Sequence, residues 1–187
     1  LATMQQVVEA DGGDFSKVDL IPNNIVDEAG ALKEQQTDAI WIYYGWGGIS
    51  AELQGLDFNY FYFKDLDPVF DYYTPVIIAN NDFLAEHPDT AKAFLSATAK
   101  GYEYAIAHPE EAAQMLIESD TTGSLKDSAE LVTASQKWMA DQYQAEAERW
   151  GYIDPSRWNA FYRWLSDNNL VEQPIPENTG FSNDYLA

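Results

Sequence analysis

Residues 39–49, with the sequence AIWIYYGWGGI, constrain the fold more than any other part of the chain. The first half of this stretch predicts a buried strand, in which Ile40 and Ile42 face one side and Trp41 and Tyr43 face the other. The glycines that follow predict a tight turn that opens a helix. A strand that passes through a turn directly into a helix is the repeating unit of a sheet with helices on its faces, so this stretch favours an α/β fold.

In the rest of the first half of the chain, predicted strands also alternate with predicted helices. Hydrophobic spacing and turn residues predict helices at residues 4–8, 25–35 and 49–53 and strands at residues 18–21, 37–44, 58–63 and 73–79. This order of elements predicts a parallel or mixed sheet.

From Asn80 onward the pattern is helical. Pro88, Pro109 and Pro155 each suit the first position of a helix, where the missing N–H has no partner to lose. Ser124 with Asp127 predicts the start of one further helix, by analogy with a capping box.

Composition removes several classes of function. The chain has 31 acidic and 10 basic residues, a net charge of −21, so we expect neither nucleic acid nor an anionic membrane as a partner. It has no cysteine, which excludes disulfides, zinc–thiolate sites and cysteine nucleophiles. No apolar run approaches the ~20 residues of a membrane span. Because the sequence begins Leu-Ala-Thr-Met, we expect the natural protein to start earlier.

Aromatic side chains at the end of the predicted strand point to a small-molecule site. In open α/β sheets, ligands bind beyond the carboxyl ends of the strands, and glycines let the backbone approach a ligand closely. The candidate ligand-binding residues are Trp41, Tyr43, Tyr44, Gly45, Trp46, Gly47 and Asn23. The alternative is that these are core aromatics and turn glycines, which is the favoured interpretation for Trp41 alone. Asn23 and Asn24 have the alternative role of capping the helix that follows them.

Known motifs for other chemistry are missing. Ser50 stands where the third glycine of a dinucleotide fingerprint would be, and no phosphate-binding Gly-Lys-Ser/Thr motif occurs. His87 and His108 each precede a proline at a predicted helix start, and Asp65 and Asp67 lack the other positions of a calcium loop. We therefore predict no catalytic residue, no metal ligand and no cofactor.

The chain resembles a family of solute-binding proteins of ABC importers. Its closest likeness is to the thiamine-pyrimidine-precursor-binding branch, near the sulfonate- and nitrate-binding proteins. The stretches that carry the resemblance are residues 32–39 (LKEQQTDA), 41–49 (WIYYGWGGI), 73–88 (with YTPVIIAN, Phe83-Leu84 and His87-Pro88) and 93–113 (with AFL, Gly101-Tyr102 and HPEEAA).

This resemblance implies a periplasmic-binding-protein-like (type II) α/β fold with two lobes, of which the chain is an incomplete fragment with a helical second half. Residues 1–72 would form an α/β segment of lobe two, and residues 73–187 would return to lobe one as a strand plus the C-terminal helices. The implied function is extracytoplasmic solute binding, with no bond made or broken. The implied partners are a small, flat heterocyclic ligand of the thiamine-precursor kind and an ABC permease at the membrane. Such proteins are periplasmic or are cell-surface lipoproteins, and a second chain or a swapped dimer would complete the fold.

One position departs from the family pattern. Relatives often carry an acidic residue near Gly47, which suits an aminopyrimidine, and Gly47 itself supplies no carboxylate. This departure concerns the identity of the ligand and leaves aromatic stacking intact. Two alternatives to solute binding also stay open: a thiamine-pyrimidine synthase-like enzyme on the same fold, since some relatives make that pyrimidine, and an acidic helical interaction domain.

Overall fold

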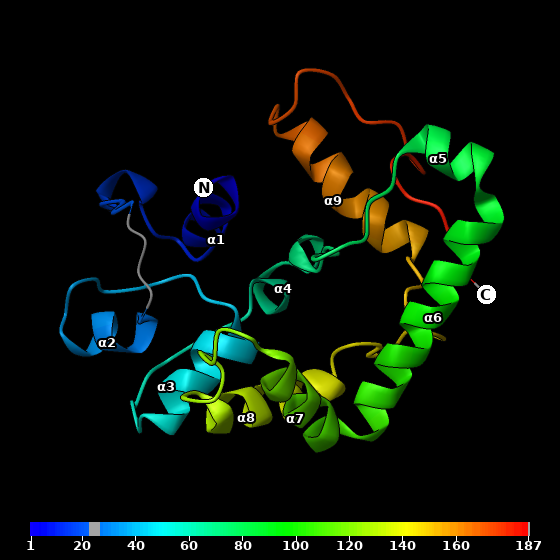
Figure 1. Ribbon diagram of the computed structural model, residues 1–187. Helices are drawn as coiled ribbons and strands as arrows, with labels where there is room; N and C mark the ends of the chain where they lie inside the picture. The colour runs from blue at the N-terminus through cyan, green and yellow to red at the C-terminus, as the bar shows by residue number, and fades with distance from the viewer. Residues whose placement is uncertain (23–26, 187) are drawn as a thin grey trace. The chain divides into compact units, whose positions relative to one another are not determined.

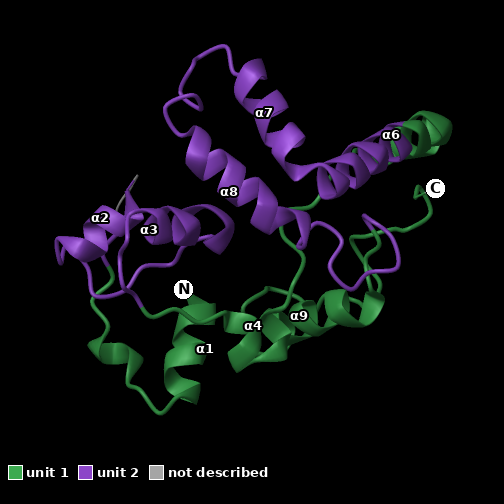
Figure 2. Cartoon of the chain, turned by 90° about the horizontal axis from the view of Figure 1, so that it is seen from below, with its two compact units in different colours: residues 1–20, 59–93, 152–187 green, residues 21–58, 94–151 purple. Residues whose placement is uncertain are grey.

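The structure is a computed structural model that describes residues 1–22 and 27–186. It contains two compact units, each assembled from separate segments of the chain (Figure 2). Unit 1 comprises Leu1–Leu20, Asn59–Ala93 and Tyr152–Ala187, and unit 2 comprises Ile21–Phe58 and Phe94–Gly151. The boundary between residues 93 and 94 falls inside the long helix α6, which is labelled in Figure 1 and carries the colours of both units in Figure 2.

Unit 1 contains helices from both ends of the chain. Its described helices are α1 (Ala2–Ala10), α4 (Phe63–Leu66), α5 (Asn81–Glu86), α9 (Pro155–Asp167), two short 3-10 turns (Phe15–Lys17 and Pro68–Phe70) and the first residues of α6 (Pro88–Ala107). Each of the two 3-10 turns is preceded by an aspartate, Asp14 or Asp67, whose carboxylate accepts a hydrogen bond from a backbone N–H of the turn.

Aromatic side chains hold unit 1 together. Phe70 is buried and meets Trp164 edge to face, with ring centroids 5.1 Å apart. Tyr72 stacks on Phe161 at 4.3 Å, so the segment after Phe70 also lies along α9. Contacts of this geometry contribute beyond the area that the rings bury.

Unit 2 contains α2 (Glu28–Lys33), α3 (Ile49–Leu53), α7 (Pro109–Ser119), α8 (Ala129–Ala140), the rest of α6 and a π-helical turn at Tyr44–Gly48. Its hydrophobic core lies where α7 packs on α8 and consists of Ala113, Ile117 and Val132, with Leu125 and Ala129 beside it. The face of α8 that does not contact α7 packs against the π-helical turn and α3.

The helix starts predicted from proline are confirmed. Helices α6, α7 and α9 begin at Pro88, Pro109 and Pro155. Asp154 accepts a hydrogen bond from the N–H of Arg157, which completes the N-terminal cap of α9. The helices predicted at residues 4–8 and 49–53 are present as α1 and α3, and the helix predicted at 25–35 is present in its described part as α2.

The start predicted at Ser124 is wrong, because α8 begins at Ala129. The side chain of Ser124 donates instead to the Asp120 carboxylate, which also accepts the N–H of Leu125. Asp120 therefore closes a loop before the helix, and the side chain of Ser124 bonds within this loop rather than capping a helix.

The predicted strands are not confirmed: within residues 1–22 and 27–186 no segment forms a paired strand. Val18, Tyr43 and Tyr62 have extended backbone angles, with ψ of 119°, 113° and 137°, at or near the predicted positions. A strand also requires a neighbour that exchanges N–H and C=O hydrogen bonds with it, and these segments meet none among the described residues. The segment predicted to run through Phe63 stops being extended there, because α4 begins at that residue.

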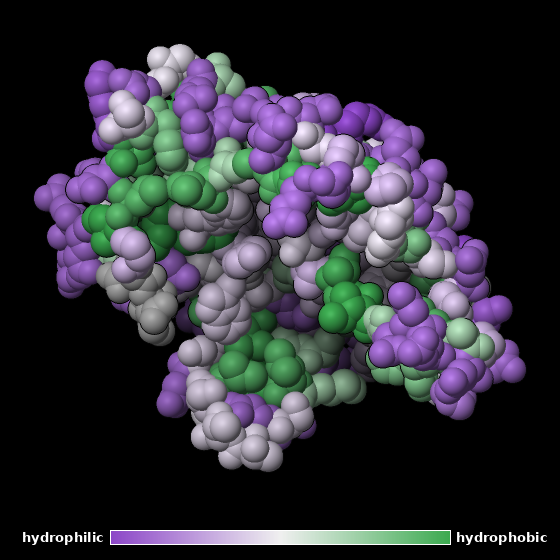
Figure 3. Space-filling view, turned by 90° about the horizontal axis from the view of Figure 1, so that it is seen from above, coloured by the Kyte–Doolittle hydropathy of each residue, from purple (hydrophilic) through white to green (hydrophobic). Residues whose placement is uncertain are grey.

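Apolar side chains remain at the surface of the described segments (Figure 3). In unit 1, Val76, Ile77 and Ile78 are 46%, 54% and 87% exposed, respectively, in the segment predicted to be a strand at 73–79. Consecutive exposed apolar residues of this kind are typical of surfaces that contact another molecule or segment. Among the described helices, none combines the length and apolar character needed to cross a bilayer.

Candidate functional site

The glycine-rich stretch forms one turn of π-helix at Tyr44–Gly48, called the π-turn below, which leads directly into α3. The N–H groups of Trp46 and Gly47 both donate to the carbonyl of Tyr43, at 3.0 and 2.9 Å. Single π-helical turns are rare and are frequent at functional sites. The π-turn is therefore the structural centre of the candidate site.

Tyr44 forms the inner part of this site. Its ring lies against Gly48, where a Cβ would come within 2.5 Å of Cδ2, and its hydroxyl donates to Oε1 of Glu52 at 2.5 Å. The ring also packs against Trp138 of α8, with centroids 5.3 Å apart and planes tilted by 46°. Because three groups surround it, Tyr44 supports the π-turn as much as it lines a surface.

Gly45 brings α8 onto the π-turn. Its carbonyl accepts a hydrogen bond from Oγ of Ser135 at 2.5 Å. A Cβ at Gly45 would lie 2.8 Å from Sδ of Met139 and 3.0 Å from the ring of Trp138. Glycine is therefore required here by close packing.

Gly47 is buried between the side chains of Ile42 and Glu28. A Cβ at this position would meet Cβ of Ile42 at 3.2 Å and the carboxyl carbon of Glu28 at 3.6 Å. Glu28 is the first residue of α2, and Asp27 fixes the start of that helix by accepting the N–H of Gly30 at 3.0 Å. The carboxylate that Gly47 lacks is thus present beside it, supplied by another helix.

Three large rings of the predicted site reach solvent. Trp41, Tyr43 and Trp46 are 46%, 75% and 43% exposed. Neither Tyr43 nor Trp46 makes a ring contact or a side-chain hydrogen bond with a described residue. Their faces are available to stack on a flat molecule. Asn23, the remaining predicted site residue, lies outside the described residues.

Sequence reasoning missed the partners of the π-turn. Ser135, Trp138 and Met139 all lie on α8, and nothing in their spacing indicates that this helix packs on a turn at Gly45, 90 positions before Ser135. Glu28 and Glu52 lie on short helices whose partners are likewise set by the tertiary structure.

The electrostatic character of the π-turn is acidic. Glu28 and Glu52 contact Gly47 and Tyr44, respectively. Lys137 of α8 pairs with Glu110 at 2.6 Å, and its hydrogen bond and charge lower the pKa of the Glu110 carboxyl. Lys137 is thereby engaged away from the residues that face the π-turn.

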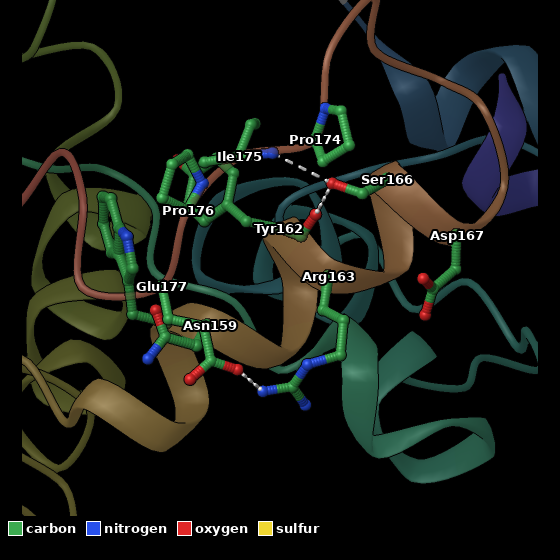
Figure 4. A pocket seen from close by; sticks show the side chains of 10 residues that line it. Asn159, Tyr162, Arg163, Ser166, Asp167, Pro174, Ile175, Pro176 and Glu177 are labelled. Atoms are coloured by element: carbon green, nitrogen blue, oxygen red, sulfur yellow. Dashed lines mark hydrogen bonds and ion pairs between the residues drawn. The ribbon is translucent and has the colours of Figure 1, made fainter.

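A pocket of about 200 Å³ lies in unit 1, between α9 and residues 174–177 (Figure 4). Three of its lining residues with polar side chains are bonded to other residues of its walls. Oγ of Ser166 donates to the Tyr162 carbonyl and accepts the N–H of Ile175, and Arg163 pairs with Glu177. The volume is below the ~300 Å³ at which small-molecule sites begin. We interpret this pocket as the seam where the C-terminal segment packs on α9.

The histidines lie where the sequence predicts. His87 follows α5 and His108 directly precedes α7, and their rings contact Phe83 and Tyr104, respectively. In the part of the chain that the structure describes, no group of three or more histidine or carboxylate side chains gathers as a metal site would require.

Comparison with known proteins identifies the family. The model of the family described as "NMT1/THI5 like" matches residues 1–112 of the 187 in the chain. The chain therefore belongs to the NMT1/THI5-like family, and this membership implies a periplasmic-binding-protein-like fold.

Two curated relatives differ in their named roles. The chain is 25% identical over 184 residues to the formylaminopyrimidine-binding protein of Halalkalibacterium halodurans, an alignment that covers 96% of this chain and 54% of that protein. It is 28% identical over 118 residues to the 4-amino-5-hydroxymethyl-2-methylpyrimidine phosphate synthase of Candida albicans, covering 61% of this chain and 31% of that protein. The chain thus spans about half the length of the first relative and about a third of the second.

Proposed function

We propose that this chain is part of the extracytoplasmic solute-binding component of an ABC importer, and that its ligand is a flat pyrimidine of the thiamine-precursor kind. The observation that carries this proposal is the alignment of 96% of the chain with a formylaminopyrimidine-binding protein. An ABC permease at the membrane is the corresponding partner.

The π-turn is the proposed wall of the ligand site. Trp46 and Tyr43 supply exposed ring faces, and Gly45 and Gly47 fix the shape of the backbone between them. Stacking on such a ring contributes about 0.5–1.5 kcal/mol beyond burial. Tyr44 holds the turn from behind, against Trp138. Trp41, beside them, and Asn23 complete the proposed set.

The proposed fold has two lobes, with residues 1–72 in lobe two and residues 73–187 returning to lobe one. The segments at 37–44 and 73–79, which the sequence predicts to be strands, would then pair with strands of a sheet to which this chain contributes only a part. The exposed Val76, Ile77 and Ile78 support this proposal, because pairing and packing in such a sheet would cover them. A second chain or a swapped dimer is another way to cover the same segment.

A synthase of the thiamine pyrimidine is the second candidate, because a relative carries that name. Such an enzyme needs reactive side chains at its cleft. This chain has no cysteine, and its two histidines contact Phe83 and Tyr104 at helix ends, away from the π-turn in sequence. These features favour binding over synthesis.

The test is to identify what the natural full-length protein binds. Mass spectrometry of small molecules released from the purified protein should detect an intact pyrimidine, and formylaminopyrimidine should raise the melting temperature while sulfonates and nitrate should not. Formation of a new pyrimidine phosphate during incubation would instead support the synthase. No thermal shift with any thiamine precursor would overturn the ligand class.

A matched pair of variants tests the wall itself. Trp46→Ala should weaken pyrimidine binding by about tenfold or more, because stacking and burial are both lost. Phe94→Ala is the control, since Phe94 is also an exposed aromatic residue of unit 2 but lies on α6. If Trp46→Ala and Phe94→Ala bound the pyrimidine with equal affinity, Trp46 would not be part of the ligand site.

A further inference from the structure

The acidic residues of this chain far outnumber the bases that could pair with them. The chain has 31 acidic and 10 basic residues, so that one acid for every base would still leave a net charge of −21. Five of these bases already form ion pairs with one acid each: Lys17, Lys137, Arg149, Arg157 and Arg163. Because charge of one sign destabilises a compact state through self-repulsion, most of the carboxylates depend on positive charge from outside the chain.

Some of these acids stand at helix ends where a negative charge is unfavourable. Glu9, Glu118 and Asp167 lie in the last turns of α1, α7 and α9, and all three are exposed. The C-terminal end of a helix carries partial negative charge, so a base is favoured there and an acid is not. In these three described helices the last turn contains no base. Glu9 and Glu118 accept hydrogen bonds from Gln5 and Gln114, whose amides bring no charge.

Acids also occupy the opposite ends of described helices. Asp82, Asp89 and Glu130 lie in the first turns of α5, α6 and α8, where the helix dipole favours them. Stabilisation by the dipole would place acids at this end alone, so it does not account for the acids at the other end.

Concentrated salt removes this conflict. The interaction of a charge with the helix dipole is screened by salt. The Debye length falls from ~10 Å at 0.1 M salt to ~3 Å at 1 M, so repulsion between exposed carboxylates weakens as well. An acid at a helix C-terminus then costs little, and the whole acidic surface becomes compatible with a stable fold.

We infer that this protein is adapted to concentrated salt, in which cations of the surrounding solution compensate the carboxylates that its own bases leave unpaired. These cations need no dedicated site, because screening acts on exposed charges wherever they lie. The inference is independent of the proposed function, since it is carried by surface acids at helix ends and not by the π-turn. It adds a condition for folding, which is the salinity of the medium.

The first experiment follows the melting temperature of the natural full-length protein by circular dichroism as NaCl is raised. From about 0.1 M to about 2 M NaCl the melting temperature should rise by about 10 °C or more. A protein that is unfolded at the low end and folded at the high end gives the same support. A melting temperature that stays constant or falls would overturn the inference and leave the acids as a feature of solubility.

The second experiment uses two triple variants that remove the same charge from opposite helix ends. The first combines Glu9→Gln, Glu118→Gln and Asp167→Asn, and at about 0.1 M NaCl it should melt about 5 °C above the wild-type protein. The matched control combines Asp82→Asn, Asp89→Asn and Glu130→Gln at exposed positions where the dipole favours acids, so its melting temperature should rise less or fall.

At about 2 M NaCl the advantage of the first variant should disappear, because salt then does what the substitutions do. No advantage at low salt, or an advantage that persists at high salt, would show that solution cations do not act at these helix ends and would overturn the inference. Both experiments are carried out without a pyrimidine, so their outcome does not depend on the ligand site.

Discussion

Gly48 lies directly against the ring of Tyr44, so closely that a Cβ at position 48 would come within 2.5 Å of Cδ2 and 2.9 Å of Cε2. The half-buried ring is held at two further points: its hydroxyl donates to Glu52, and it packs against Trp138 with the two ring planes tilted by 46°. The shape of the π-turn is therefore set by the absence of one methyl group.

Gly48→Ala should destabilise unit 2 by about 1–3 kcal/mol, the usual cost of adding a methyl group to a closely packed site. Chemical denaturation followed by circular dichroism measures the change. The control is Gly101→Ala within α6, where a Cβ meets nothing within 4 Å. Alanine there should stabilise the protein by about 0.5–1 kcal/mol, because it restricts the unfolded chain and favours helix. Equal effects of the two substitutions would contradict the packing argument.

Local features of the sequence predict the helical half of the fold well. Pro88, Pro109 and Pro155 mark the starts of α6, α7 and α9 because proline at the first helical position acts through its own backbone geometry. The strands were predicted less well. Extended backbone at Tyr43 and Tyr62 follows from local preference, but a ladder depends on a partner segment, which the residues of the strand do not specify.

The candidate site also has some features that the sequence predicts and others that it does not. The place of Trp46 in a glycine-rich turn could be predicted, but the exposure of Tyr43, which the sequence places in a buried strand, could not. The contacts that shape the π-turn could not, because Ser135 and Glu28 reach it from helices far away in the sequence. Helix periodicity gives the face that a residue occupies and leaves the partner of that face open.

The hydrogen bond from Ser135 to the carbonyl of Gly45 gives a second prediction. Ser135→Ala should cost about 1 kcal/mol in the free energy of unfolding, because the carbonyl of a packed turn loses its donor. It should also weaken ligand binding, since α8 no longer holds the π-turn in place. Ser119→Ala is the control: its hydroxyl is exposed and bonds only within its own helix, so both measurements should stay near the wild-type values. If Ser135→Ala bound the ligand with unchanged affinity, α8 would not be needed to hold the ligand site in shape.

Arg157 gives a third prediction, in unit 1. Its Nε donates to the Asp71 carbonyl at 2.5 Å, a terminal nitrogen pairs with the Asp71 carboxylate at 2.8 Å, and the guanidinium lies over the ring of Tyr73 at 4.3 Å. Arg157→Ala should destabilise the protein by about 1.5–3 kcal/mol, and Arg157→Lys should recover little, because an ammonium group cannot make the forked and stacked contacts together.

The control for this prediction lies on the same helix. Arg163 forms an ion pair with Glu177 in which both side chains are more than half exposed. Arg163→Ala should therefore change the free energy of unfolding by only about 0–1 kcal/mol. If Arg157→Lys matched the wild-type stability, the contribution of Arg157 would be its charge alone.

Asp120 gives a prediction about pH. The N–H of Leu125, the hydroxyl and N–H of Thr122 and the hydroxyl of Ser124 all donate to its carboxylate, and they lower its pKa well below the usual 3.8. Since the pKa in the folded state is below that in the unfolded chain, these bonds stabilise the fold fully above pH 3.8 and lose their effect as the pH falls further. Asp120→Asn should therefore lower the melting temperature at neutral pH, and the difference from the wild-type protein should shrink as the pH approaches about 2.

Asp127→Asn, in the same loop, is the control, because the carboxylate of Asp127 has no hydrogen-bond partner among the described residues. A difference between wild type and Asp120→Asn that stays constant across this range would show that the loop is held by its backbone rather than by the charge of Asp120.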